Sequence, residues 1–330
     1  MGSARRALGA ALVLALVMTS LSAAMSAPMK QARRSIIAFE HSPFPFTGTV
    51  PGKEEPFLDV EKDGRKGHTS PRGGVYWQDE TYSDRRVLLD IPRGFDPNAP
   101  GVILVYFHGN QSKLERDVVR RQGVPRQVAA SGINAVLVAP QFAVNALDST
   151  VGRFYEPGFF AKFMDEAARR LAELSGNPKN KGLFDAMPVV LVAYSGGYVG
   201  AGWVAHHGGL GDRVQGILLF DALYGEFDKF SAWIGRRGPG VFFSAHTKSS
   251  KDGNATLQAS LGSRGIDLYE ELPQQLRPGS VTFLSATNEE LIHFDFMTKA
   301  WVDDPLRAVL ARLAMYKRQP QPPAKAKKKP

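Results

Sequence analysis

Ser195 lies between a run of apolar residues and a pair of glycines, a setting that can expose a nucleophilic hydroxyl. Residues 190–194 have the sequence VLVAY, which predicts a buried strand, and Gly196 begins a tight turn before a probable helical segment. Ala193 and Gly197 are small, as closely spaced backbones at such a turn require. The alternative is a purely structural turn or a phosphate cradle, but neither G-x-G-x-x-G nor a phosphate-loop pattern is present.

A serine hydroxyl becomes a useful nucleophile when an imidazole removes its proton and a carboxylate orients that imidazole. His206 and His207 follow Ser195 on the same expected helix at a rise that places them roughly 17 Å away, too far to act on it. His293 follows the last expected strand and precedes the terminal helix, whereas His246 ends an earlier strand. The chain has seven histidines, the others being His41, His68 and His108.

Two carboxylates are candidates for the orienting acid. Asp221 directly follows the apolar run 216–220, and Asp252 lies a few residues after the run 241–245. The carboxyl ends of parallel strands form the edge at which ligands bind in open α/β sheets. Asp221 is the better placed of the two, although it could instead cap a local turn.

Apolar runs alternate with segments of helical periodicity over most of the chain. This pattern predicts the α/β class, with a mostly parallel sheet of seven to eight strands and helices on both faces. We expect a single domain spanning residues 74–316, because no internal repeat is present. The expected strands are 86–91, 102–107, 135–139, 189–193, 216–220, 241–245 and 281–285, and the clearest helices lie near 160–174 and 305–313.

The turn at Ser195 resembles the nucleophile elbow of α/β-hydrolases, with Ala193 in place of the more usual glycine. This resemblance implies that Ser195 is the nucleophile and His293 the base, since the histidine of that family follows the last strand. It also implies the chain order serine, acid, histidine, which Asp221 satisfies. Asp252 remains the alternative acid, because many members place the acid one strand later.

The run FHGNQ at residues 107–111 follows a buried strand, where the resembled family places its second oxyanion-hole loop. By this match, the backbone N–H of Gly196 and that of Asn110 or Gln111 would bind a developing oxyanion. On its own, the run would be interpreted as a polar turn.

The N-terminal residues are typical of a signal peptide. Arg5 and Arg6 precede the apolar run 7–17, and small residues follow, so we expect residues 1–26 to be removed on export to the periplasm or outside the cell. An uncleaved anchor is the alternative, but the run is short for a membrane span. The arginine pair leaves the choice between general and twin-arginine export open.

The net charge of +9 is concentrated at the two ends of the chain. Residues 28–316 carry a net charge of only about +1, so the body offers no basic face for nucleic acid. We expect residues 27–73 to be an extended lead-in and the Lys- and Pro-rich residues 317–330 a disordered tail. That tail could contact an anionic envelope surface weakly.

Together these features predict an exported serine hydrolase of an ester, thioester or amide, acting on a small or acyl substrate. No cysteine is present, which excludes a thiol nucleophile, and we expect no metal and no cofactor. Two alternatives remain: a non-catalytic envelope binding protein with the same fold, and a cell-wall amidase or peptidase.

Overall fold

Eight strands form one twisted sheet in the described part of the chain. The computed structural model describes residues 27–236, 238, 240–286 and 292–318. The strand order is β1-β5-β7-β6-β8-β9-β10-β11; β1 and β5 run antiparallel to their neighbours, and the other pairs are parallel. The strands are β1 (Arg33–Ala38), β5 (Arg86–Ile91), β6 (Val102–Phe107), β7 (Ala135–Pro140), β8 (Val189–Tyr194), β9 (Val214–Phe220), β10 (Val241–His246) and β11 (Val281–Ser285).

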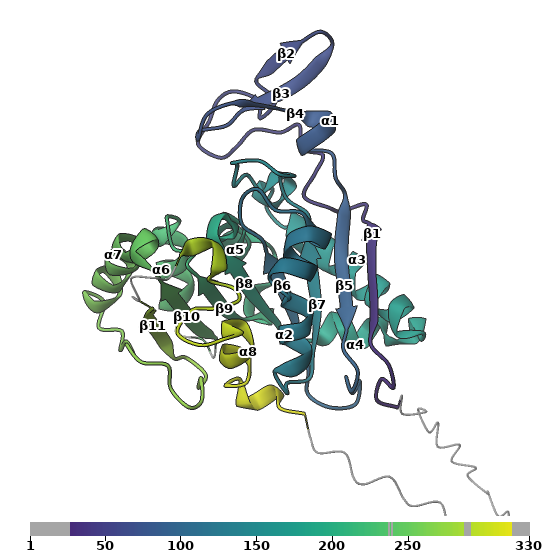
Figure 1. The fold of residues 1–330 in the computed structure, drawn as a ribbon, viewed down its shortest axis with the longest axis vertical. Coiled ribbons are helices and arrows are strands. Elements are labelled where there is room, and N and C mark those ends of the chain that lie inside the picture. The colour runs from purple at the N-terminus through teal and green to yellow at the C-terminus, as the bar shows by residue number, and fades with distance from the viewer. Residues whose placement is uncertain (1–26, 237, 239, 287–291, 319–330) are drawn as a thin grey trace, which may run out of the picture.

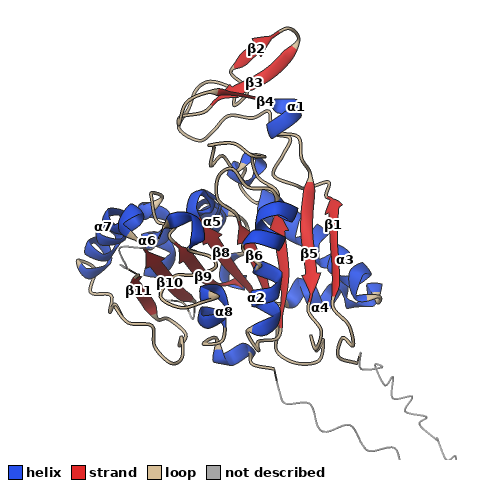
Figure 2. Cartoon of the chain, in the orientation of Figure 1, coloured by secondary structure: helices blue, strands red, loops and turns tan. Residues whose placement is uncertain are grey.

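Helices cover both faces of the sheet (Figure 2), which confirms the predicted α/β class and strand number. One face packs against α3 (Phe159–Ser175), α4 (Lys181–Ala186), α5 (Tyr198–His207), α6 (Phe227–Gly235) and α7 (Lys251–Gly262). The other packs against a π-helix (Leu114–Arg121), α2 (Val124–Ala130) and α8 (Pro305–Leu310). None of the described helices is long and apolar enough to cross a bilayer.

The strands are buried on both sides, which explains why they are continuous apolar runs. In β6, Ile103 and Val105 contribute to one apolar cluster, whereas Leu104 and Tyr106 contribute to the other. This alternation follows from the two-residue period of a strand. The buried central strands therefore hold their carboxyl ends rigidly in one row, where the candidate residues lie.

Residues 27–73 were expected as an extended lead-in, but they contribute two pieces of regular structure. Residues Arg33–Ala38 form the edge strand β1, paired with β5, and Arg34 forms an ion pair with the buried Asp90 at 2.7 Å. The expected boundary at residue 74 is therefore too late. The strand carries two arginines and lies half exposed at the edge, so it lacks the apolar run that revealed the others.

The segment between β1 and β5 also folds as an insert with its own small sheet. Three antiparallel strands, followed by the short helix α1, stand beyond the carboxyl edge of the main sheet (Figure 1). These elements are β2 (Val60–Lys62), β3 (Arg65–Thr69), β4 (Val75–Trp77) and α1 (Gln78–Thr81). We refer to residues 42–85 as the insert.

The two ends of the chain are described only in part. Residues 1–26, expected as a signal peptide, and residues 319–330 lie outside the described residues. Lys317 and Arg318, the first two residues of the expected tail, are ordered: Arg318 donates from its backbone N–H to Gly132 O at 2.9 Å and from Nε to Ile133 O at 2.8 Å. These two residues were therefore wrongly assigned to a disordered tail.

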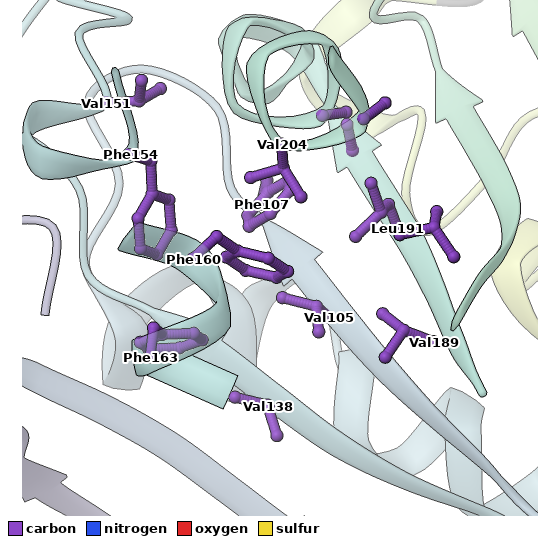
Figure 3. Packing of buried hydrophobic residues seen from close by; sticks show 14 of the residues in the cluster. Val105, Phe107, Val138, Val151, Phe154, Phe160, Phe163, Val189, Leu191 and Val204 are labelled. Carbon is purple, nitrogen blue, oxygen red and sulfur yellow. The ribbon is translucent and has the colours of Figure 1, made fainter. Parts of the chain in front are cut away.

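Aromatic rings fill the space between α3 and the sheet (Figure 3). The ring of Phe154 is fully buried. Its centroid lies 5.1 Å from the ring centroid of Phe160 and 5.2 Å from that of Phe163, both on α3. On the sheet side it packs against the ring of Phe107, with the two centroids 6.3 Å apart. This packing joins α3 to the end of β6, just before the loop that carries Asn110.

Replacing Phe154 with Ala is expected to lower the free energy of unfolding by about 3–5 kcal/mol, because it removes a buried ring and leaves a cavity. Urea unfolding followed by circular dichroism measures the effect. Met315→Ala, at a side chain 39% exposed, is the control and should change stability by less than about 0.5 kcal/mol. Equal losses in both variants would contradict this account of the core.

Candidate active site

The chain makes a strained turn at Ser195, directly after β8. Ser195 has a φ of 53°, in the left-handed region that side chains other than glycine rarely adopt, and the turn continues into α5. A Cβ on Gly197 would lie 2.2 Å from Phe107 O, and one on Gly109 would lie 2.7 Å from Ser195 Cβ. Both positions therefore require glycine, and the turn presents the Ser195 hydroxyl at the carboxyl edge of the sheet.

His293 lies within hydrogen-bond distance of this hydroxyl. Its Nε2 is 2.7 Å from Ser195 Oγ, although the two residues are 98 positions apart in the chain. His293 follows β11 in a loop that returns to the carboxyl ends of β8 and β9, and its side chain is 35% exposed. This geometry suits transfer of the serine proton to the imidazole.

Asp221 binds the other nitrogen of the same ring. Its Oδ2 lies 2.6 Å from His293 Nδ1, so the imidazole donates from Nδ1 and faces Ser195 with Nε2. The carboxylate is fully buried at the end of β9 and also accepts from Thr247 N, Thr247 Oγ1, Ser249 Oγ and Ser250 Oγ. Burial alone would raise the pKa of Asp221, but the hydrogen bond from His293, followed by those from Ser250 and Thr247, lowers it to about 2.

The remaining candidates for acid and base lie elsewhere. Asp252 is exposed on the first turn of α7, and none of its described contacts involves His293. His246 is buried at the end of β10, where its Nδ1 lies 3.1 Å from Thr247 O. The structure therefore brings together Ser195, His293 and Asp221.

The two candidates for the second oxyanion donor differ in their hydrogen bonds. The backbone N–H of Gln111 donates to Ala146 O at 2.8 Å, so it is occupied, contrary to one of the two expectations. The backbone N–H groups of Gly196 and Asn110 donate to no other group in the described part of the chain. A Cβ on Gly196 would lie 2.4 Å from the side-chain amide of Asn110, so the two residues are in contact beside Ser195.

His108 holds the loop that contains Asn110. The ring is buried; its Nδ1 donates to Gly109 O at 2.8 Å, and its Nε2 accepts from the backbone N–H of Phe142 at 2.9 Å. Burial lowers the pKa of His108 to about 4, so the ring is neutral near pH 7. Its role in the described structure is to position the loop.

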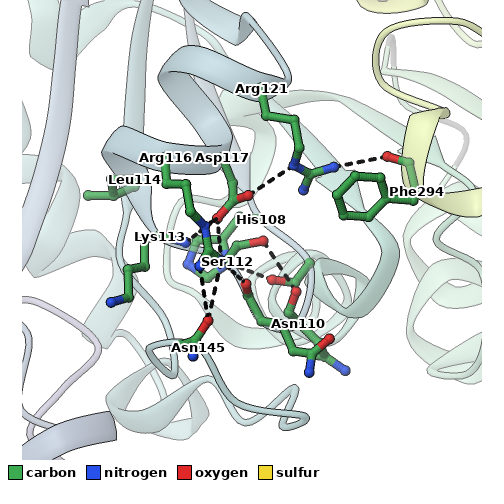
Figure 4. A network of polar contacts seen from close by, with 12 residues as sticks. His108, Asn110, Ser112, Lys113, Leu114, Arg116, Asp117, Arg121, Asn145 and Phe294 are labelled. Carbon is green, nitrogen blue, oxygen red and sulfur yellow. Dashed lines mark hydrogen bonds and ion pairs between the residues drawn. The ribbon is translucent and has the colours of Figure 1, made fainter.

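Two residues that the sequence did not single out for this purpose support the loop of His293. The Tyr194 ring stacks on the imidazole with centroids 5.1 Å apart, and its hydroxyl donates to His293 O at 2.8 Å. Arg121 donates from Nη1 to Phe294 O at 2.9 Å and from Nε to Asp117 at 2.9 Å (Figure 4). Tyr194 adjoins Ser195 in the chain, but its partner lies 99 residues later, and no sequence pattern joins them.

One cavity of about 390 Å³ lies away from this site. It is lined by residues at the amino ends of three strands, including Val214, Phe242 and Val281, together with Trp233 and Tyr269. Because these strands are parallel to β8, the cavity and Ser195 lie at opposite edges of the sheet. It therefore plays no part in the geometry around Ser195.

β7 lies on one side of β6 and β8 lies on the other, so the connections from these strands run in opposite directions across the sheet. In open α/β sheets, ligands bind outside the carboxyl ends of the strands at such a change of direction. Ser195, Asp221 and His293 meet there in that chain order, and Ser195 lies on a strained strand-to-helix turn. Together with the strand order, these features are typical of a single fold. The chain has an α/β-hydrolase fold.

No protein-family model and no curated protein sequence matches this chain. Solved structures similar to it include a feruloyl esterase module from Clostridium thermocellum, with a TM-score of 0.44, 13% identity and coverage of 84% of this chain and 96% of that one. An S-formylglutathione hydrolase from Agrobacterium tumefaciens has a TM-score of 0.44, 12% identity and coverage of 77% and 98%. A dienelactone hydrolase from Anabaena variabilis has a TM-score of 0.40, 11% identity and coverage of 87% and 100%. Similarity this distant does not bear on the substrate.

The low pKa of Asp221 predicts a specific dependence of stability on pH. A carboxylate with a folded pKa below its unfolded value stabilises the protein above the unfolded pKa, near 4, and loses that contribution as the pH falls through the folded value, about 2. Wild type is expected to lose on the order of 2 kcal/mol of unfolding free energy over this window that Asp221→Asn does not lose. Urea unfolding at a series of pH values from 7 towards 2 measures the difference.

Asp252→Asn is the matched control for this experiment, because the Asp252 side chain is exposed. It should keep the pH dependence of wild type. The same acid-induced loss in Asp221→Asn as in wild type would show that the buried carboxylate is not held ionised in the fold.

Tyr194→Phe removes one hydrogen bond to the His293 loop and keeps the ring stacked on the imidazole. We expect kcat to fall about fivefold, since a bond worth about 1 kcal/mol holds the loop in register. Tyr106→Phe is the matched control, because the Tyr106 hydroxyl is also buried and donates to Gln122 Oε1 at 2.7 Å. Tyr106 lies on β6, which carries none of Ser195, His293 and Asp221. A comparable loss of kcat in both variants would show that the effect comes from lower stability of the fold and not from the loop of His293.

Proposed function

We propose that this protein is a serine hydrolase that cleaves an ester, thioester or amide bond through an acyl-enzyme. The observation that carries the proposal is the continuous chain of two hydrogen bonds, 2.7 Å from Ser195 Oγ to His293 Nε2 and 2.6 Å from His293 Nδ1 to Asp221 Oδ2. No cofactor is needed for this chemistry.

In the first half of the reaction, Ser195 Oγ attacks the substrate carbonyl carbon and its proton passes to His293 Nε2. The negative charge that develops on the carbonyl oxygen is stabilised by the N–H groups of Gly196 and Asn110. Each such donor contributes about 100- to 1,000-fold in rate in comparable sites. The tetrahedral intermediate then collapses, and the leaving group departs with the proton from His293.

In the second half, water attacks the acyl-enzyme and His293 removes its proton. The water oxygen bonds to the acyl carbon, the bond from that carbon to Ser195 Oγ breaks, and the acyl group leaves as the free acid while the imidazolium returns a proton to Oγ. Asp221 stays ionised throughout, because its pKa of about 2 lies far below neutral pH. It keeps the imidazole in the tautomer that faces Ser195 and stabilises the imidazolium.

A fluorophosphonate probe tests this proposal because it reacts covalently with activated serines. Wild type should be labelled at Ser195, as identified by mass spectrometry of the labelled peptide. Ser195→Ala should abolish labelling, and His293→Ala should slow it at least about 1,000-fold, since the hydroxyl then lacks its base. Ser83→Ala, at an exposed serine in the insert, is the control and should label like wild type.

Folded wild-type protein that stays unlabelled would contradict catalysis and favour a non-catalytic binding protein with this fold. Labelling combined with release of peptide or amine from cell-wall material, and not of alcohols from esters, would assign the enzyme to amidases or peptidases. Circular dichroism of each variant verifies that loss of labelling does not reflect loss of folding.

We also propose that the protein acts outside the cytoplasm. The charged pair Arg5–Arg6 followed by an apolar run supports removal of residues 1–26 on export. Mass spectrometry of the protein recovered from a bacterial periplasmic fraction should find a new N-terminus after Ala24 or Ser26. An intact N-terminus in the membrane fraction would instead indicate an anchor.

A further inference from the structure

The insert is attached to the domain beside the candidate active site. Ser70 Oγ donates to Leu147 O at 2.7 Å, and Tyr76 Oη accepts from the backbone N–H of Leu147 at 3.1 Å. Tyr82 Oη donates to Asp148 Oδ2 at 2.5 Å. Asp148 and Ser149 in turn contact Asn110, so the insert is joined to the loop that supplies the candidate oxyanion donor.

The turn at residues 70–74 has a fixed backbone. Ser70 N donates to Gly74 O at 3.0 Å, Gly73 N donates to Ser70 O at 2.9 Å, and Arg72 N donates to Ser70 Oγ at 3.2 Å. Gly73 and Gly74 have φ values of 93° and 87°, which favour glycine at both positions. The anchored turn therefore holds the backbone of Arg72, an exposed residue, in one place.

The Arg72 side chain points to the active site. With the Asn110 amide oriented so that its nitrogen donates to Asp148 O and Ser149 Oγ, Arg72 Nη1 donates to the Asn110 amide oxygen at 3.0 Å. The same Asn110 side chain packs against Gly196, the residue after Ser195. One side chain therefore separates the guanidinium from the nucleophile turn.

Two tyrosines around Ser195 also lie within the field of Arg72. Burial raises the pKa of Tyr198, and the positive charge of Arg72 opposes this rise. The same charge acts on Tyr224, whose pKa burial raises to about 12 and whose hydroxyl is 3.4 Å from His293 Nδ1. The guanidinium that binds Asn110 is thus close enough to both tyrosines for its charge to act on them.

In the described part of the chain, Arg72 forms no ion pair, and the neighbouring carboxylates have other partners. Asp148 accepts from Tyr82 and from the backbone N–H of Thr150 at 2.7 Å. Glu226 forms an ion pair with Lys229 at 2.6 Å. A guanidinium has five N–H donors in a planar fork that matches a carboxylate, and here one of them binds Asn110.

We propose that Arg72 binds a carboxylate group of the substrate, so that the ester or amide cleaved at Ser195 is anionic. This inference rests on the proposed function and extends it by a substrate class. The contact would leave the bond from Arg72 to Asn110 in place, because that bond uses only one of the five N–H donors of the guanidinium. The simplest compounds of this class are half-esters of dicarboxylic acids and hydroxybenzoic acids acylated at the phenol oxygen, both of which keep a free carboxylate.

Two matched pairs of esters test the proposal in the full-length protein. Mono-4-nitrophenyl glutarate is compared with 4-nitrophenyl butyrate, and 4-acetoxybenzoate with phenyl acetate, so that the charge lies on the acyl side in one pair and on the leaving group in the other. Arg72→Gln should lower kcat/KM for the charged member of at least one pair by about 10- to 100-fold, as expected for a charge-assisted contact. The neutral members should change less than about threefold.

Arg93→Gln is the matched control, since Arg93 is an exposed arginine after β5 at the opposite edge of the sheet. It should leave all four rates unchanged. Arg72→Lys keeps the charge without the fork and should restore part of the preference. Raising the salt concentration should raise KM for the charged ester in wild type and Arg93→Gln but not in Arg72→Gln.

Other outcomes separate this inference from the proposed function. An equal fall in kcat for charged and neutral esters would overturn it, because Arg72 would then act through Asn110 on the reaction itself. Unchanged rates in Arg72→Gln would overturn it as well. If wild type hydrolyses none of the four esters, fluorophosphonate labelling still decides the proposed function, and glutarate binding then tests the contact without turnover. Glutarate should raise the melting temperature of wild type and Arg93→Gln only; the same shift in Arg72→Gln would overturn the inference.

Discussion

The close approach of two strand ends is the constraint on which the candidate site depends. The chain leaves β6 and β8 at the same point of the sheet, and the two backbones come so near that a Cβ on Gly197 would overlap Phe107 O. A bulkier residue there would force apart the turn that presents Ser195 and the loop that carries Asn110. The strained φ of Ser195 persists because both flanking strands are buried and cannot adjust.

Three further segments complete the site around this contact, each from a different strand end. Asp221 follows β9, its hydrogen-bond donors follow β10, and His293 follows β11. Parallel strands place all these ends at one edge, which is why residues almost 100 positions apart lie within a hydrogen bond of each other. The geometry of the candidate site therefore depends on the order of the strands in the sheet more than on any local motif.

Much of this architecture could be predicted from the sequence because the central strands are buried on both faces. Such strands have continuous apolar runs, and the chemistry-bearing residues Ser195 and Asp221 follow two of them directly. The edge strand β1 and the insert could not be predicted in the same way. Their sequences are short and charged, and their structure depends on partners such as Asp90 and Leu147 that lie far along the chain.

Within the site, the sequence reduced the number of candidate residues for each role but did not decide between the two candidates for the second oxyanion donor. Asn110 and Gln111 are adjacent and equivalent as a pattern; only the bond from Gln111 N to Ala146 O separates them. The stacking of Tyr194 on His293 and the approach of Arg72 to Asn110 likewise join residues with no shared periodicity. Long-range side-chain contacts of this kind follow from tertiary packing, which a single sequence does not display.

The hydrogen bonds around Asp221 have a consequence for the loop that bears His293. Besides the bond from His293, the carboxylate accepts four bonds from Thr247, Ser249 and Ser250, all of which belong to the connection after β10. Withdrawal of the imidazole would therefore leave no isolated anion inside the protein, a situation that would otherwise be very costly. The carboxylate thus keeps most of its hydrogen bonds independently of the imidazole, whose loop is held in place by the contacts of Tyr194 and Arg121.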